Sequence, residues 1–296
     1  MFPKVSIIIL NWNGLKDTIE CLESLRKITY PNYEVIVVDN GSEGNDADVL
    51  EEKYKDYIKV IRNKENLGFT GGNNVGIKYA MEKGSEFFLI LNNDVVVKED
   101  FLEPLVEDML KDKKIGIIGP VSYCYGSLEL FSSGRKINYW KGNFKGIDLF
   151  QNKKEVDSLA GCCLLVKKEV VEKIGYFYEP YFLIFEETEY CLRAKRAGFK
   201  IVCEPRSKIW HKVGSTIRRF PASNAYYFYR NKLLFTKRNA PFYVKYLFYF
   251  YYSGYLFFRF IEELIKKENL IAFSIKDALV DFWKGNFGKR NSIEKL

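Results

Sequence analysis

Paired cysteines, the pattern typical of disulfide-rich and thiolate–metal proteins, are missing from this sequence. The 296 residues contain six cysteines, and no two of them are spaced as CxxC. Free thiols in a reducing cytoplasm are therefore the simplest interpretation. Only one histidine, His211, is present, and nothing near it in the sequence supports a cysteine protease. The first apolar segment, residues 5–10, is too short for a secretory signal.

Long uncharged runs and a one-sided charge are also absent. The uncharged stretch in the aromatic part of the chain, residues 246–258, is 13 residues long, whereas a membrane-spanning helix needs about 20. The 46 basic residues are interspersed with 38 acidic ones, and the net charge is +8. This balance favours anionic partners such as phosphates, nucleotides or acidic lipids, and we expect no nucleic-acid partner. Hydrophobic residues at 47% exclude intrinsic disorder.

Two common nucleotide-binding motifs are missing as well. No GxxxxGK[ST] is present, which excludes P-loop chemistry, and the first predicted strand is followed by NWNG rather than GxGxxG. The later glycines at 68, 71, 72 and 76 have the wrong spacing for a dinucleotide site. Glycines at such positions either let the backbone approach a ligand closely or simply begin a helix.

Strand-like and helix-like segments alternate along the chain. Apolar, β-branched runs predict strands at residues 5–10, 34–38, 58–62, 87–91, 115–119, 159–166 and 200–203. Helical spacing predicts helices at residues 15–27, 49–57, 101–110, 168–174 and 187–198, and the glycine-rich residues 66–74 open a further helix that ends near residue 81. Residues 120–158 indicate loops or a small hairpin. This order predicts an α/β domain with a mostly parallel, Rossmann-like sheet flanked by helices.

The composition becomes strongly aromatic after about residue 220. We predict an α/β domain over residues 1–220 and a helical, aromatic-rich region over residues 221–296. Tyrosine-rich helices flanked by Lys and Arg favour the headgroup region of a membrane. Peripheral binding to the inner face of the cell membrane is one interpretation, and a contact between two copies in a homodimer is another. A helix simply packed on the first domain is the third.

Polar side chains follow four of the predicted strands. They are Asn11-Trp12-Asn13-Gly14 after the first strand, Asp39 after the second, Asn66 to Asn74 after the third, and Asn92-Asn93-Asp94 after the fourth. Ligands of open parallel sheets bind outside the carboxyl ends of the strands, so four such clusters predict a site at one edge. Each cluster alone is also an ordinary turn sequence.

An ordered set of segments resembles the family-2 glycosyltransferases with the GT-A fold. The segments are VSIIILNWNG, VIVVDNGS, NLGFTGGNNVGI, LILNNDVVV, LAGCCLLV, FLIFEETEYCLRAKRAGF, WHKVGST and YYFYRNKLLFTKR. Together they cover about residues 4–238, and the nearest similarity is to the rhamnosyltransferase-like branch that builds surface polysaccharides. The resemblance implies a donor that is a nucleotide-diphosphate sugar, such as a dTDP- or UDP-sugar.

The resemblance also implies roles for the polar clusters. The family holds a divalent cation, Mg²⁺ or Mn²⁺, through an Asp-x-Asp motif, which here is Asn92-Asn93-Asp94 with Asp94 as the strong ligand. His211 in WHKVGST matches the family's histidine that completes the metal site. The expected nucleotide-sugar-binding residues are Asn11, Asn13, Asp39, Asn66, Gly68, Gly72, Asn92, Asn93 and Asp94. The first Asp of the motif is an Asn here, which leaves metal affinity as an open question.

Inverting transfer needs one general base to take the proton of the acceptor hydroxyl. The family's base belongs to a Glu-Asp pair before a helix, which here is Glu186-Glu187. We predict that Glu187 is the base, and Glu186 is the alternative. The predicted function is a metal-dependent inverting glycosyltransferase acting on a glycan or lipid-linked acceptor. A catalytically weak or inactive nucleotide-sugar- or glycan-binding protein and a nucleotidyltransferase are the alternatives.

Overall fold

The apolar runs of the sequence form the centre of a mixed ten-stranded sheet. The computed structural model describes residues 2–212 and 220–290. Its strands are β1 (Val5–Asn11), β2 (Tyr33–Asp39), β3 (Ile58–Arg62), β4 (Phe87–Asn92), β5 (Val95–Val97), β6 (Ile115–Cys124), β7 (Leu130–Ser132), β10 (Lys154–Glu155), β11 (Cys163–Lys167) and β12 (Lys200–His211). A separate hairpin consists of β8 (Arg135–Asn138) and β9 (Asn143–Gly146), which confirms a small hairpin within residues 120–158.

The strand order explains where a site can form. The order is β10-β12-β6-β11-β4-β1-β2-β3, with β5 added to β12 and β7 added to β6. Strands β4, β1, β2 and β3 are mutually parallel, and β11 runs antiparallel between β4 and β6. The carboxyl ends of β1, β2 and β4 therefore meet at one edge, as the sequence predicts.

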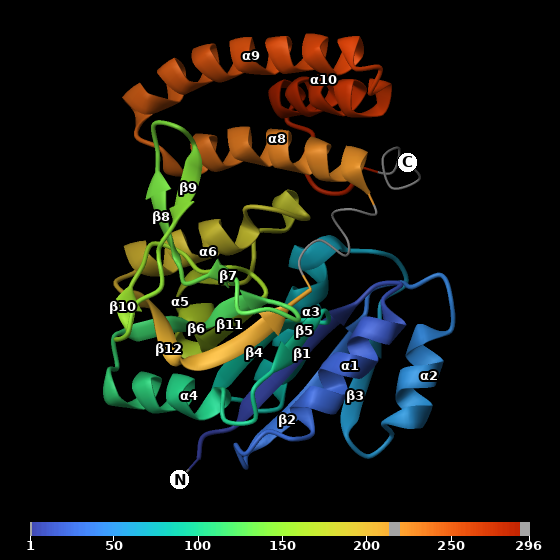
Figure 1. Cartoon of the computed structure of the whole chain (residues 1–296), viewed down its shortest axis with the longest axis vertical. Helices are drawn as coiled ribbons and strands as arrows, with labels where there is room; N and C mark the ends of the chain where they lie inside the picture. Colours follow the sequence, from blue (N-terminus) through green and yellow to red (C-terminus); the bar gives the residue numbers. More distant parts are fainter. Residues whose placement is uncertain (1, 213–219, 291–296) are drawn as a thin grey trace.

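Helices cover both faces of this sheet (Figure 1). They are α1 (Leu15–Leu25), α2 (Asp46–Lys53), α3 (Gly68–Glu82), α4 (Leu102–Lys111), α5 (Lys168–Ile174) and α6 (Glu186–Arg196), with a 3₁₀ turn, η1 (Glu179–Tyr181), before α6. One apolar core lies between the sheet and α1, α2 and α4, and a second lies between the sheet and α3, α5 and α6. Residues along β1 such as Ile7 and Ile8 are fully buried because each face of the strand meets one of these cores.

The prediction that the last strand ends at Cys203 is wrong. β12 continues to His211, pairing with β6 in parallel and with β5 in the antiparallel sense, so that His211 lies opposite Val95. Pro205 cannot donate to a strand ladder, and it falls in the register shift between Glu204 and Lys208, where the ladder is interrupted. A proline that usually ends a strand therefore marks a bulge here.

Other predicted boundaries differ by a few residues. β6 extends beyond residue 119 to Cys124, while β11 begins only at Cys163, because residues 161–162 form a turn before it. Helix α2 begins at Asp46 rather than at residue 49.

Three helices follow the sheet: α8 (Pro221–Asn239), α9 (Phe242–Ile265) and α10 (Asn269–Lys284). Figure 1 shows them stacked at one end of the molecule, with α9 outermost and the β8–β9 hairpin reaching toward α8. Their own small core includes Leu233, Phe248, Tyr252 and Ile275. Among the described helices, none combines the length and the apolar character that a membrane span requires.

Gly76 lets helix α3 pack closely on the sheet. A Cβ at Gly76 would lie 2.4 Å from Cγ2 of Ile8 in β1. We expect Gly76→Ala to lower the free energy of unfolding by about 1–3 kcal/mol, because the added methyl group overpacks a core contact. Denaturant unfolding measures this.

The matched control is Gly254→Ala in the middle of α9, where an added Cβ meets nothing within 4 Å. It should raise stability by up to about 1 kcal/mol, since alanine favours a helix over glycine. Equal effects at the two positions would contradict the packing role of Gly76.

Candidate functional site

A cavity of about 260 Å³ lies at the carboxyl ends of β1 and β4. Its lining comes from seven parts of the chain: Leu10, Trp12, Asn40, Asn66, Gly68, Phe69, Asn92, Asn93, Asp94, Phe182, Leu183, Ile184, His211, Phe220, Ser223 and Asn224. Of the residues predicted from the sequence, it therefore brings together Asn66, Gly68, Asn92, Asn93, Asp94 and His211. Asn11, Asn13, Asp39, Gly72, Glu186 and Glu187 do not line it.

Asp94 and His211 are neighbours in the cavity wall. Nε2 of His211 lies 3.1 Å from Oδ1 of Asp94, and both side chains are about 10% exposed. The backbone fixes this pair, because the N–H of Lys212 donates to the carbonyl of Asp94 at 2.9 Å and β5 pairs with the end of β12. The ring of Phe131 packs 4.8 Å from the imidazole. The end of the WHKVGST motif, residues 213–216, lies outside the described residues.

This pair fits part of a divalent-cation site. A carboxylate oxygen and an imidazole nitrogen are donors that Mn²⁺ accepts, and the oxygen also suits Mg²⁺. Nδ1 of His211 has no hydrogen-bond partner among the described residues. Within residues 2–212 and 220–290, no group of three or more His, Cys, Asp or Glu side chains forms a complete cage. The remaining ligands of such an ion would come from outside the described residues, for example from a bound molecule or from water.

Asn11 and Asp39 lie in a hydrogen-bond network that joins the loops after β1 and β2. Nδ2 of Asn11 donates to Oδ1 of Asp39 at 2.9 Å and to Oδ2 of Asp46 at 3.0 Å, while Oδ1 of Asn11 accepts from Thr18 at 2.7 Å. Asn13 accepts a bond from the N–H of Glu43 at 2.8 Å. These residues shape the edge of the sheet from behind the cavity lining. A direct role for them in nucleotide binding stays a prediction.

Asn40, next to Asp39, is the residue of this loop that lines the cavity, and sequence reasoning missed it. Nδ2 of Asn40 donates to Oδ1 of Asn66 at 3.0 Å and to the carbonyl of Gly68 at 3.2 Å. The loop after β2 and the loop before α3 are thereby joined across the cavity wall. Gly72 contributes indirectly, because a Cβ there would lie 2.3 Å from Leu10 and 3.2 Å from Asn40.

Asn93 turns away from its neighbour Asp94. Its Nδ2 donates to Oγ1 of Thr18 at 2.9 Å and lies 3.4 Å from the carbonyl of Gly14. Asn93 thus fastens the loop after β4 to the beginning of α1.

The opposite wall of the cavity is a segment of unusual backbone, residues 182–185, which we call the strap. Phe182, Ile184 and Phe185 have φ of 64°, 70° and 76°, values that non-glycine residues rarely adopt. Asn231 of α8 donates to the carbonyls of Leu183 at 2.6 Å and Ile184 at 2.9 Å, and to that of Tyr181 at 2.8 Å.

Arg230, the residue before Asn231, holds the turn that leads into the strap. It donates to the carbonyls of Pro180 at 3.2 Å and Tyr181 at 3.0 Å, and it is almost completely buried. Gly68, with φ of +70°, faces the other side of the strap, since a Cβ there would lie 2.4 Å from the carbonyl oxygen of Phe182. No local sequence pattern predicts these contacts, although the strap and residues 226–238 lie in segments that carry the family resemblance.

Glu186 and Glu187 follow the strap at the beginning of α6, and both are buried. Nη1 of Arg135, on the β8–β9 hairpin, donates to Oε1 of Glu187 at 2.6 Å. Oε2 of Glu186 has no hydrogen-bond partner among the described residues. Burial, together with the neighbouring Glu187 carboxylate, raises the pKa of Glu186 well above its ordinary value. The two glutamates are therefore unequal: one is ion-paired, and the other favours its neutral form.

This inequality predicts how stability depends on pH. The folded chain keeps a proton on Glu186 that the unfolded chain releases above about pH 4.3. The free energy of unfolding should therefore fall as pH rises from that value toward the folded-state pKa. Glu186→Gln carries no ionisable proton, so we expect it to be more stable than wild type at pH 7 and equally stable below about pH 4.

Thermal and denaturant unfolding across this pH range measure the difference. Glu268→Gln serves as the control, because Glu268 is exposed and forms no ion pair with the described residues. A stability difference at Glu186 that is the same at low and neutral pH would show that folding does not raise the pKa of this carboxyl group.

Comparison with known proteins gives a consistent picture. Residues 6–175 match the sequence profile described as Glycosyl transferase family 2. The chain is 29% identical over 245 residues to the low-salt glycan biosynthesis hexosyltransferase Agl10 of Haloferax volcanii, covering 79% of this chain and 76% of that protein. It is 25% identical over 255 residues to the dTDP-rhamnosyl transferase RfbF of Shigella flexneri, covering 81% and 82%.

Solved structures share the fold. A mannosyltransferase from Pyrobaculum calidifontis, in complex with GDP-Man and Mn²⁺, superposes with a TM-score of 0.60 at 14% identity and covers 96% of this chain and 88% of that one. Other solved chains of the same fold are longer, and this chain spans less than half of two of them. These likenesses establish the GT-A architecture, including a mostly parallel sheet followed by C-terminal helices.

Proposed function

The chain belongs to glycosyl transferase family 2. We propose that it transfers a sugar from a nucleotide-diphosphate sugar to a hydroxyl of a glycan or lipid-linked acceptor, with inversion at the anomeric carbon. The observation that carries the proposal is the meeting of Asp94 and His211 at 3.1 Å in the wall of the cavity. Asp94 lies directly before β5 and His211 is the last residue of β12, so the two are far apart in the sequence. Both are donors suited to a cation that accompanies a diphosphate.

A divalent cation bound there, Mg²⁺ or Mn²⁺, would offset the negative charge that develops on the departing diphosphate. The protein's part is to hold donors in place: Asp94 offers its carboxylate, His211 its imidazole, and Asn92 an amide beside them in the same lining. Hydrogen bonds of the neighbouring backbone keep these side chains in position before any ligand arrives.

The rest of the lining supports a nucleotide-sugar donor. The rings of Trp12 and Phe220 lie 5.5 Å apart and both line the cavity, which provides an aromatic surface for a base or sugar ring. Asn40 and Asn66 add amide groups on another side. The similarity to a dTDP-rhamnosyl transferase and to a hexosyltransferase supports a dTDP- or UDP-hexose as donor.

Glu187 is the proposed general base. A base must be ionised to accept the proton of the acceptor hydroxyl. Glu187 forms an ion pair with Arg135, whereas burial raises the pKa of Glu186 and favours its protonated form. The pair lies just beyond the strap, so an acceptor would reach it from the side of the β8–β9 hairpin.

We also propose two parts for the chain, residues 1–220 and 221–296, working on the cytoplasmic side of the membrane in polysaccharide or glycoconjugate synthesis. The first helix of the second part serves the site of the first, because Ser223 and Asn224 of α8 line the cavity. The relatives that act in glycan synthesis support this setting.

The reaction class is tested by incubating the chain with a panel of nucleotide-diphosphate sugars and glycan acceptors. Release of the nucleoside diphosphate that requires an acceptor supports sugar transfer. Release of sugar 1-phosphate, with the nucleoside monophosphate joined to the acceptor, would indicate a nucleotidyltransferase, and binding without turnover would indicate an inactive binding protein.

Asp94→Ala and His211→Ala should each abolish the increase in nucleoside-diphosphate affinity that Mn²⁺ produces, because each removes one of the two donors. Calorimetric titration of UDP and dTDP with and without Mn²⁺ measures this. Asp100→Ala, which removes an exposed carboxylate in the loop between β5 and α4, is the control. Unchanged metal-stimulated affinity in Asp94→Ala would remove Asp94 from the site.

Glu187→Gln should lower the rate of transfer by roughly 10²–10⁴-fold while donor binding persists, because the amide cannot accept a proton. Glu186→Gln is the matched control and should retain most of the activity, since that side chain already favours its neutral form. Initial rates at saturating donor separate the two variants. The reverse pattern would assign the base to Glu186.

A further inference from the structure

The outer face of α9 lacks charge along its whole length. Large apolar side chains are exposed from one end to the other, among them Phe242, Tyr246, Phe250, Phe257, Phe258 and Ile265. Every Lys, Arg, Asp and Glu between Phe242 and Ile265, a range that the structure describes completely, is half-buried or buried. Helices of water-exposed surfaces normally carry their charges outward.

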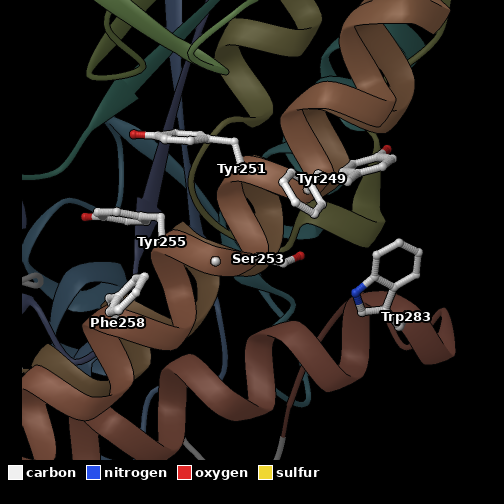
Figure 2. A pocket seen from close by; sticks show the side chains of 8 residues that line it. Tyr249, Tyr251, Ser253, Tyr255, Phe258 and Trp283 are labelled. Atoms are coloured by element: carbon white, nitrogen blue, oxygen red, sulfur yellow. The ribbon is translucent and has the colours of Figure 1, made fainter.

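This uncharged face continues across a groove onto α10. Figure 2 shows the groove, of about 790 Å³, between α9 and Trp283 of α10, with Ser253 on its floor. Gly254, which also lines it, has no side chain to fill the space. In Figure 2, Tyr251 and Tyr255 lie side by side with their hydroxyl groups pointing the same way. We call the exposed apolar side chains of α9, together with Phe273, Val280 and Trp283 of α10, the aromatic face.

Positive charge borders the aromatic face on α10. Lys276 and Lys284 are exposed on the same side of that helix as Phe273, Val280 and Trp283, and the Lys276 ammonium lies 5.9 Å from the Phe273 ring. Four lysines of this region form no ion pair with the described residues: Lys245, Lys267, Lys276 and Lys284. Four of the five acidic side chains between Phe242 and Lys284 are neutralised, since Glu262 and Glu263 pair with Arg259, and Asp277 and Asp281 pair with Arg290. The fifth, Glu268, is exposed and forms no ion pair with the described residues.

We propose that the aromatic face binds the surface of a bilayer that contains anionic lipids. Tyrosine and tryptophan rings place an apolar body among acyl chains and a polar group at the headgroups, and unpaired lysines add attraction to anionic headgroups. The exposed apolar surface spans a 24-residue helix, or about 36 Å at 1.5 Å per residue. A helix lying in the plane of the membrane uses such a face without crossing the bilayer.

Charge distinguishes this occupant from a second copy of the chain. A two-fold dimer through the aromatic face would bring the unpaired lysines of one copy toward those of the other, since both partners present the same surface. An anionic membrane presents the opposite charge. The inference does not depend on sugar transfer, because membrane binding can be measured without any substrate.

The experiment is sedimentation of the full chain with vesicles of phosphatidylcholine mixed with phosphatidylglycerol, and with vesicles of phosphatidylcholine alone, at low and high salt. We expect the chain to sediment with the mixed vesicles at low salt and to be released by high salt, which screens the lysines. Lys276→Glu combined with Lys284→Glu should lower the partition coefficient about tenfold or more. Phe250→Ser combined with Trp283→Ser should lower it by at least a similar factor, because two large apolar anchors are removed.

Matched controls change the same residue types elsewhere. Lys59→Glu with Lys64→Glu alters two exposed lysines near β3 that form no ion pair with the described residues, and Leu128→Ser alters an exposed apolar side chain outside α9 and α10. These variants should bind within about twofold of wild type. Because all substituted side chains are exposed, unchanged thermal unfolding confirms that each variant folds.

The proposal fails if the wild-type chain stays in the supernatant with mixed vesicles at low salt, or if the two aromatic-face variants bind as well as the controls. Equal binding to both vesicle types also overturns it, since anionic lipid would then be irrelevant. Sedimentation velocity without vesicles tests the second copy: a dimer that Phe250→Ser with Trp283→Ser converts to a monomer, without vesicle binding, assigns the face to self-association.

Discussion

Backbone strain in the strap is the constraint on which the site depends. Phe182, Ile184 and Phe185 hold positive φ without being glycine, a conformation that costs of order 1–3 kcal/mol per residue and persists only where the surroundings fix it. One fixing partner is Asn231, whose side-chain amide donates to the carbonyl groups of Tyr181, Leu183 and Ile184. The wall of the cavity and the start of α6 both follow from the strap, so their positions are set by α8 and also by α3, whose Thr70 N–H donates to the carbonyl of Phe182 at 3.3 Å.

The C-terminal helices thereby take part in the site. On one side of α8, Asn231 binds the strap and Arg230 binds the turn before it, and the beginning of that helix lines the cavity. On the far side, α10 packs on α8 and α9 forms the outer layer, as Figure 1 shows. A membrane bound by the aromatic face of α9 and α10 would therefore be separated from the cavity by α8.

Much of the fold follows from local patterns, because strands buried on both faces must be continuously apolar, as Ile7 and Ile8 illustrate. The sequence predicts the pairing of Asp94 with His211 only through the family resemblance. No rule of sequence spacing connects the residue before β5 with the last residue of β12. Two features had no usable signal. Positive φ at bulky residues such as Phe182 is set by tertiary contacts, and a single sequence does not tell which of Asp39 and Asn40 faces the cavity.

The register shift in β12 has a consequence for how the chain tolerates change. His211 reaches the cavity only after the irregularity between Glu204 and Lys208, and successive side chains of a strand point to opposite faces. Losing or gaining one residue in that interval would turn the imidazole away from Asp94, and it would also turn the buried Ile209 out of the apolar core. The segment can therefore exchange residues at its exposed positions, but its length is fixed. An insertion there would damage the sheet and the site together.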